Sequence, residues 1–159
     1  MQKTVNPLHQ AVSLLARRDH SEFELRQKLG VKGHDDAAIE EVIRVLESKG
    51  YLNEKRYAET MLRHHAMRGQ GPQKIRYLLT QQQVSNALIS EVFSESDADW
   101  FSLAAQVREK RFGVNALPQE RAQRYKEQSR QMRFLMSRGF EQDQIQFAMA
   151  SLESAEQEN

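Results

Sequence analysis

The strongest constraint on the fold of this chain is a short pattern that occurs three times. An apolar residue is followed directly by Arg and, four positions after the first residue, by a second apolar residue. The three copies are Leu25-Arg26…Leu29, Ile75-Arg76…Leu79 and Met132-Arg133…Met136, so their arginines lie 50 and 57 residues apart. Self-similarity at a nearly fixed period is typical of repeat architectures. The sequence therefore predicts an array of small units.

The composition favours helices over strands. Val, Ile and Thr together number 17 in 159 residues, and Gln alone also numbers 17. Strands favour β-branched residues, whereas helices favour straight-chain ones. We therefore expect an all-α protein.

Capping residues and glycines divide the chain into nine amphipathic segments. Ser21-x-x-Glu24 forms a capping box, and Pro72 suits the first turn of a helix, where its missing N–H costs nothing. Asp97 is the expected cap of the seventh helix, and Gly139 ends the eighth. Three helices per copy of the pattern predict three-helix repeats at 7–52, 53–96 and 97–152, followed by an acidic, frayed tail at 153–159.

Each three-helix repeat is too small to bury a stable core alone, so neighbouring repeats should share apolar contacts. The recurring pattern marks the residues that we expect at equivalent buried positions. These core candidates are Leu25, Leu29, Ile75, Leu79, Met132 and Met136.

Several functional classes find no support in the sequence. The chain has no cysteine, no Gly-x-Ser-x-Gly elbow and no nucleotide-binding glycine loop, so we expect neither an enzyme nor a cofactor. Adjacent His64 and His65 would point about 100° apart on a helix and cannot easily share a metal. No signal peptide or membrane span is evident, which favours a cytoplasmic protein without membrane contact.

Charge is unevenly distributed although the net charge is only +1. Residues 54–82 carry six bases and two acids, and residues 108–138 carry nine bases and three acids, whereas 83–107 and 139–159 contain acids but no base. Solvated helix faces usually mix both signs, so two basic blocks indicate binding to phosphates or to an acidic protein surface. The candidate contact residues are Arg63, Arg68, Lys74, Arg76, Arg108, Lys110, Arg111, Arg121, Arg124 and Lys126.

The turn Gly69-Gln70-Gly71 before Pro72 allows two interpretations. It can be a tight connection between helices, or its helix N-terminus can hold an anion. It lacks the Lys-Ser/Thr pair of a nucleotide-binding loop, which favours the structural interpretation.

Four motifs follow one another along the chain. They are Arg18-Asp19-His20-Ser21-x-x-Glu24-Leu25-Arg26-x-Lys28-Leu29, Gly50-Tyr51-Leu52-Asn53-x-x-Arg56-Tyr57-Ala58, Gly69–Leu79 and Arg138-Gly139-Phe140. Together they resemble the RecX family, bacterial regulators of the RecA recombinase. The resemblance covers about residues 8–152, and the central motif is the most specific one. Asn53 stands where an acidic residue is expected, but either residue caps a helix.

The resemblance implies an elongated, curved body of three three-helix repeats that binds in the groove of the RecA–DNA filament. It implies inhibition of filament growth, ATP hydrolysis, strand exchange and co-protease activity by a non-enzymatic protein. We also expect a monomer with weak, non-specific affinity for single- or double-stranded DNA. The alternative from another class is a helical DNA-binding regulator of helix-turn-helix type.

Overall fold

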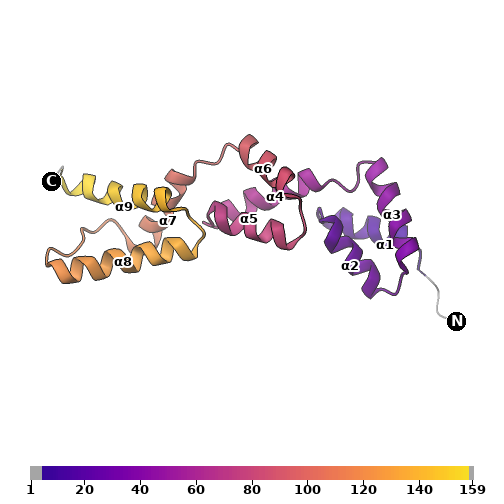
Figure 1. Cartoon of the computed structure of the whole chain (residues 1–159), viewed down its shortest axis with the longest axis horizontal. Helices are drawn as coiled ribbons and strands as arrows, with labels where there is room; N and C mark the ends of the chain where they lie inside the picture. Colours follow the sequence, from indigo (N-terminus) through magenta and orange to yellow (C-terminus); the bar gives the residue numbers. More distant parts are fainter. Residues whose placement is uncertain (1–4, 158–159) are drawn as a thin grey trace. The chain divides into compact units, whose positions relative to one another are not determined.

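The structure, a computed structural model, describes residues 5–157, with side chains described through Leu152. Over this range the chain forms nine α-helices and no strand, which confirms the all-α prediction (Figure 1). The predicted tail at 153–159 lies outside the described side chains, although the backbone of the last helix extends to Gln157. The helices are α1 (Pro7–Arg17), α2 (Glu22–Val31), α3 (Asp36–Ser48), α4 (Glu54–Met67), α5 (Pro72–Gln81), α6 (Asn86–Glu95), α7 (Trp100–Phe112), α8 (Arg121–Ser137) and α9 (Gln142–Gln157).

Most helix starts follow from the capping residues in the sequence. Ser21 accepts from the Glu24 backbone N–H at 3.0 Å, as the capping box predicts, and Pro72 begins α5. The prediction for α7 was wrong by two residues. Its N-cap is Asp99, which accepts from both the backbone N–H and the hydroxyl of Ser102, at 3.1 and 2.7 Å. The helix begins at Trp100, so Asp99 and not Asp97 occupies the N-cap position directly before it.

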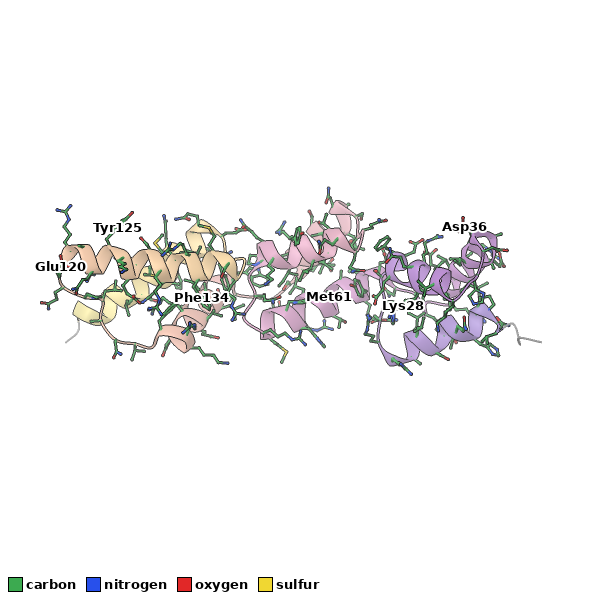
Figure 2. The ribbon with its side chains drawn as sticks, turned by 90° about the horizontal axis from the view of Figure 1, so that it is seen from below. Lys28, Asp36, Met61, Glu120, Tyr125 and Phe134 are labelled. Carbon is green, nitrogen blue, oxygen red and sulfur yellow. The ribbon has the colours of Figure 1, made fainter. Side chains whose placement is uncertain are left out.

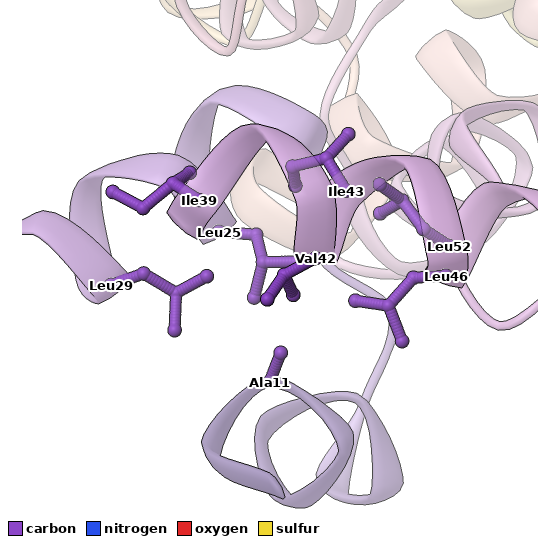
Figure 3. Packing of buried hydrophobic residues seen from close by; sticks show 8 residues of the cluster. All are labelled: Ala11, Leu25, Leu29, Ile39, Val42, Ile43, Leu46 and Leu52. Carbon is purple, nitrogen blue, oxygen red and sulfur yellow. The ribbon is translucent and has the colours of Figure 1, made fainter. Parts of the chain in front are cut away.

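The described residues form two compact units. Unit 1 contains the chain up to Met61 together with Leu79–Ser96, and unit 2 contains Leu62–Leu78 together with the chain from Asp97 onwards. In unit 1, α1, α2 and α3 pack around one apolar cluster (Figure 3). Its buried members are Ala11, Leu25, Leu29, Ile39, Val42, Ile43, Leu46 and Leu52.

In unit 2, α7, α8 and α9 surround a corresponding cluster. Leu135 and Ala148 are fully buried in it, and Phe140 and Ile145 are almost so. Met132 and Phe134 are partly buried and pack against its edge. Both units contain a buried Leu that is followed ten residues later by a buried Ile. The pairs are Leu29 with Ile39 in unit 1 and Leu135 with Ile145 in unit 2.

The turn between the second and third helix of each repeat shows the true register. In each turn, one backbone N–H bonds back to a buried Leu five residues earlier: His34 to Leu29, Val84 to Leu79 and Phe140 to Leu135. The residue before that N–H has a positive φ each time, at Gly33, Gln83 and Gly139. This is the bonding pattern of a Schellman helix end, which needs one left-handed residue.

This register corrects the core prediction in the third repeat. Leu25, Leu29, Ile75 and Leu79 are fully buried as predicted, but Met136 is 58% exposed. The buried residues there are Gln131 and Leu135, one position earlier, and Met132 is only partly buried. The equivalent positions are therefore 50 and 56 residues apart, and Arg133 is not the counterpart of Arg26 and Arg76.

Candidate functional site

Unit 2 contains an open, basic groove of about 460 Å³. The end of α4, one face of α7 and the end of α8 form its walls. Its lining holds four cationic side chains and no carboxylate. The lining residues are Met67, Arg68, Gly69, Leu103, Gln106, Val107, Lys110, Arg111, Phe134 and Arg138.

Helical spacing on α7 explains why cations gather here. Leu103, Val107 and Lys110 follow one another at intervals of four and three residues, so they lie on the face of α7 that lines the groove. Ala104 and Arg108 lie on the neighbouring face and are buried. The groove therefore combines an apolar floor with charged residues from the last turn of α7.

Aromatic rings hold two of the groove arginines in place. The Arg138 guanidinium lies 5.2 Å from the centroid of the Phe134 ring, and the Arg111 guanidinium lies 5.7 Å from the same centroid. Phe112 packs edge-on against Phe134 at 5.3 Å. Such cation–π contacts position a guanidinium without occupying its N–H donors.

A backbone contact between two glycine turns supports one end of the groove. The Gly71 N–H donates to the Arg138 carbonyl at 2.7 Å, and the Gln73 N–H donates to the Gly139 carbonyl at 2.9 Å. A Cβ on Gly71 would lie only 2.5 Å from the Gly139 oxygen, so glycine is required for this approach. The N–H groups of Gly71 and Gln73 therefore bond to protein carbonyls, which supports the structural interpretation of the Gly69–Gly71 turn over the anion site.

All ten cations predicted as contact residues belong to unit 2, but the groove gathers only three of them, Arg68, Lys110 and Arg111. Figure 2 shows Tyr125 near the start of α8 and Phe134 near its end. A rise of about 1.5 Å per residue therefore places Arg121 roughly 25 Å from Arg138 along α8. The seven predicted cations outside the groove lining are Arg63, Lys74, Arg76, Arg108, Arg121, Arg124 and Lys126.

Arg108 does not belong to the basic surface, which corrects its place among the candidates. Its side chain is only 4% exposed, because it lies one turn after Ala104 on the buried face of α7. Its Nε and Nη1 atoms have no hydrogen-bond partner among the described residues, and burial lowers the pKa of its guanidinium. A residue in this position cannot contact a partner directly.

The structure adds Arg138 and Phe134 to the groove. Arg138 is the C-cap of α8. Its position in the sequence does not show that it lies beside α7, and only the fold reveals this proximity. Its proximity to Gly139 in the Arg138-Gly139-Phe140 motif was the available signal in the sequence.

Unit 1 has a contrasting polar cluster around the start of α2. Glu24 accepts from Arg18 and lies 3.3 Å from the Lys28 Nζ atom. Burial raises the pKa of Glu24, but the hydrogen bonds and charges of Arg18, His20 and Lys28 together outweigh burial and keep that pKa below its usual range. Arg56 donates to both carboxylate oxygens of Asp19 at 2.8 and 2.9 Å. Arg18, Lys28 and Arg56 therefore each form an ion pair with a carboxylate, in contrast to the cations of the groove.

His20 lies at the centre of this cluster and is 2% exposed. Its Nδ1 atom is 3.0 Å from the Arg18 carbonyl and must donate to it, because a carbonyl only accepts. Its Nε2 atom is 2.9 Å from the Lys28 ammonium and therefore accepts. Burial lowers the pKa of His20, and this bonding pattern matches the neutral ring.

The described residues lack two other kinds of feature, a metal site and a membrane-spanning helix. No group of three or more His, Asp or Glu side chains there is arranged to hold a metal ion. None of the described helices combines the length and the apolar character that crossing a membrane requires.

Comparison with known proteins identifies the three-helix domains. Residues 8–46, 53–92 and 97–149 match family models described as the first, second and third three-helix domains of RecX. The regulatory protein RecX of Vibrio vulnificus is 43% identical over 141 residues, which is 88% of each chain. The regulatory protein RecX of Halorhodospira halophila is 42% identical over 89% of this chain and 84% of its own.

Solved structures agree on the fold. The crystal structure of RecX from Lactobacillus salivarius matches with a TM-score of 0.76 and 20% identity, over 92% of this chain and 94% of that chain. A second crystal structure of a regulatory protein RecX matches with a TM-score of 0.72 over 91% of this chain and 73% of that one. With three domain models in order and relatives above 40% identity across most of its length, the chain belongs to the RecX family of regulatory proteins.

Proposed function

We propose that this protein is a negative regulator of RecA that binds the RecA–DNA filament. Binding would inhibit filament growth, ATP hydrolysis, strand exchange and co-protease activity. Membership of the RecX family supports a regulatory role, and the groove in unit 2 supports a polyanionic target. The observation that carries the proposal is a groove lined by four cations and no carboxylate.

Electrostatics favour a filament as the target of this surface. A nucleoprotein filament displays a continuous row of phosphates, and opposite charges on a binding partner accelerate association and fix its orientation. Arg121 and Lys126 at the start of α8 are exposed and add positive charge to the same unit. Their part in the proposal is long-range attraction of the filament, secondary to the contacts of the groove cations.

The decisive measurement is the rate of ATP hydrolysis by RecA on single-stranded DNA, with and without this protein. We expect the rate to fall as the protein is added, and the inhibition to weaken with salt because the contacts are electrostatic. An unchanged rate at saturating protein would contradict the proposal.

A groove variant tests the site. Arg68→Gln with Lys110→Gln removes two exposed groove cations and leaves the arginines on Phe134 in place. Arg121→Gln with Lys126→Gln removes the same charge from the same unit outside the groove. We expect the groove variant to inhibit RecA less than this matched control does.

A gel shift without RecA separates this function from the helix-turn-helix alternative. Tight, sequence-specific retention of duplex DNA would favour a DNA-binding regulator. Weak, salt-sensitive and sequence-independent retention agrees with a filament modulator.

A further inference from the structure

The groove in unit 2 differs from an ordinary charged helix surface because its cations are fixed and unneutralised. Arg111 and Arg138 are held against Phe134, and the lining contains no acid that could pair with them. Their guanidinium N–H groups are therefore available to an external anion, with little rotamer freedom left to lose on binding.

Apolar surface lies beside these cations. Met67 at the groove edge is 87% exposed, and Leu103 and Val107 form part of the lining. A stretch of acidic protein surface would satisfy the charges but not this apolar surface. A DNA duplex keeps its base faces stacked inside, whereas a single strand presents both phosphates and exposed base faces.

We infer that this groove binds the phosphodiester backbone of single-stranded DNA, with the groove cations on the phosphates and Met67 beside a base. The inference rests on the proposed function, since it assigns to DNA one of the contacts that the protein makes with a RecA–DNA filament. It separates the groove from the cations at the start of α8, which lie roughly 25 Å away along the helix.

The number of charges gives a quantitative expectation. The logarithm of the affinity for a single strand falls with the logarithm of salt concentration by about 0.7 for each phosphate that is neutralised. Arg68→Gln with Lys110→Gln should therefore reduce this salt slope by about 1.4, and should weaken binding on the order of ten-fold at low salt.

The test measures fluorescence anisotropy of a labelled oligothymidylate with the full chain and no RecA. We expect the groove variant to lose affinity and salt dependence, and the Arg121→Gln/Lys126→Gln control to lose clearly less of both. A Met67→Ala variant should weaken binding without changing the salt slope, because it removes apolar contact alone.

Two outcomes would overturn the inference. Equal binding by the groove variant and the wild type would exclude the groove as a DNA site. A groove variant that keeps its oligonucleotide affinity but no longer inhibits RecA would show that the groove contacts protein. The proposed function is judged separately by RecA ATP hydrolysis, so wild-type protein that binds the oligonucleotide through the groove but leaves RecA unaffected would contradict only that function.

Discussion

Each unit has a hydrogen bond between helices at an equivalent position, but the charges around the two bonds are neutralised to different degrees. In unit 1, the Ser21 hydroxyl at the start of α2 donates to Gln82 in the α5–α6 turn at 2.9 Å. In unit 2, the Gly71 N–H at the start of α5 donates to the Arg138 carbonyl in the α8–α9 turn at 2.7 Å. Gly71 follows Ser21 by 50 residues and Arg138 follows Gln82 by 56. These are also the spacings between the equivalent buried residues Leu29, Leu79 and Leu135.

Two substitutions account for the difference in charge. Asp19 and Glu24, which pair with Arg56 and Arg18 in unit 1, correspond to Gly69 and Lys74 in the second repeat. The counterpart of Arg18 is Arg68, which lines the groove instead of meeting a carboxylate. The repeat framework therefore explains both regions, and the loss of two acids converts a structural junction into a surface suited to anions.

The largest expected loss of stability comes from disrupting the close contact between the Gly71 and Gly139 turns in unit 2. A Cβ on Gly139 would lie 2.7 Å from the Lys74 nitrogen, and its φ of +94° disfavours side chains. Left-handed backbone costs about 1–2 kcal/mol and overpacking about 1–3 kcal/mol, so Gly139→Ala should lower the free energy of unfolding by about 2–5 kcal/mol. Urea unfolding followed by the fluorescence of Trp100, which lies in unit 2, measures this change.

The equivalent glycine of unit 1 provides the control. Gly33 has nearly the same φ, +93°, but a Cβ there would meet nothing within 4 Å. Gly33→Ala should therefore cost only the backbone term of about 1–2 kcal/mol, measured as amide hydrogen exchange of α1–α3. Equal costs for both variants would mean that the Gly71–Gly139 contact adds nothing to stability.

The next effect tests whether both units share one register. Leu29 and Leu135 are fully buried at equivalent positions, so each change to Ala should cost about 2–4 kcal/mol. Met136→Ala should change stability by less than about 0.5 kcal/mol, because the side chain is exposed. If Met136→Ala lowered the free energy of unfolding more than Leu135→Ala does, the register with a spacing of 57 residues would be the correct one.

The sequence predicted these regions to different degrees, for physical reasons. Caps and apolar periodicity are local, so the nine helices and the first two core pairs were predictable. The third register was misplaced because Arg133 continued the pattern on an exposed face while Gln131 occupied the buried position. Charge normally keeps Arg at the surface, so burial of Arg108 was unpredictable. The groove was not predictable because it depends on contacts between α4, α7 and α8, which are distant in the sequence. The domain limits at 7–52, 53–96 and 97–152 stay a prediction.

A smaller effect concerns the matched charges of unit 1. Glu24→Gln removes the carboxylate that binds Arg18 and Lys28, and should cost about 1–2 kcal/mol, the usual value of hydrogen bonds to a charged group in a partly exposed site. Lys74→Gln at the equivalent position of unit 2 should cost less than about 0.5 kcal/mol, since it breaks no ion pair. Hydrogen exchange of each unit reports the two costs, and the reverse order would remove the electrostatic distinction between the units.

The polar cluster of unit 1 should also respond to pH. The pKa of His20 is lowered by burial, so between its folded value and about 6.5 the unfolded chain binds more protons than the folded one. Stability should therefore fall as pH drops below about 6.5. Glu24, whose pKa is also lowered, adds a further loss at lower pH, as its carboxylate becomes protonated.

His20→Gln isolates the histidine contribution. The variant should show a flatter loss of unfolding free energy between pH 7 and 5 than the wild type, whereas His9→Gln on the exposed face of α1 should follow the wild type. A wild-type curve that stays level over this range would show that protonated His20 is accommodated, with Lys28 displaced and Glu24 as its new partner.

The smallest expected effect is at the start of α8, where the cations are exposed and far from the groove. Arg121→Glu with Lys126→Glu should change the free energy of unfolding by less than about 1 kcal/mol, because exposed charges contribute little to stability. Arg121 begins α8, where the helix dipole favours negative charge, so its reversal should offset part of any loss. Thermal unfolding by circular dichroism measures the change. If these reversals destabilised unit 2 as much as Gly139→Ala, the α8 start would be part of the structural framework, and the groove would no longer be its distinct charged surface.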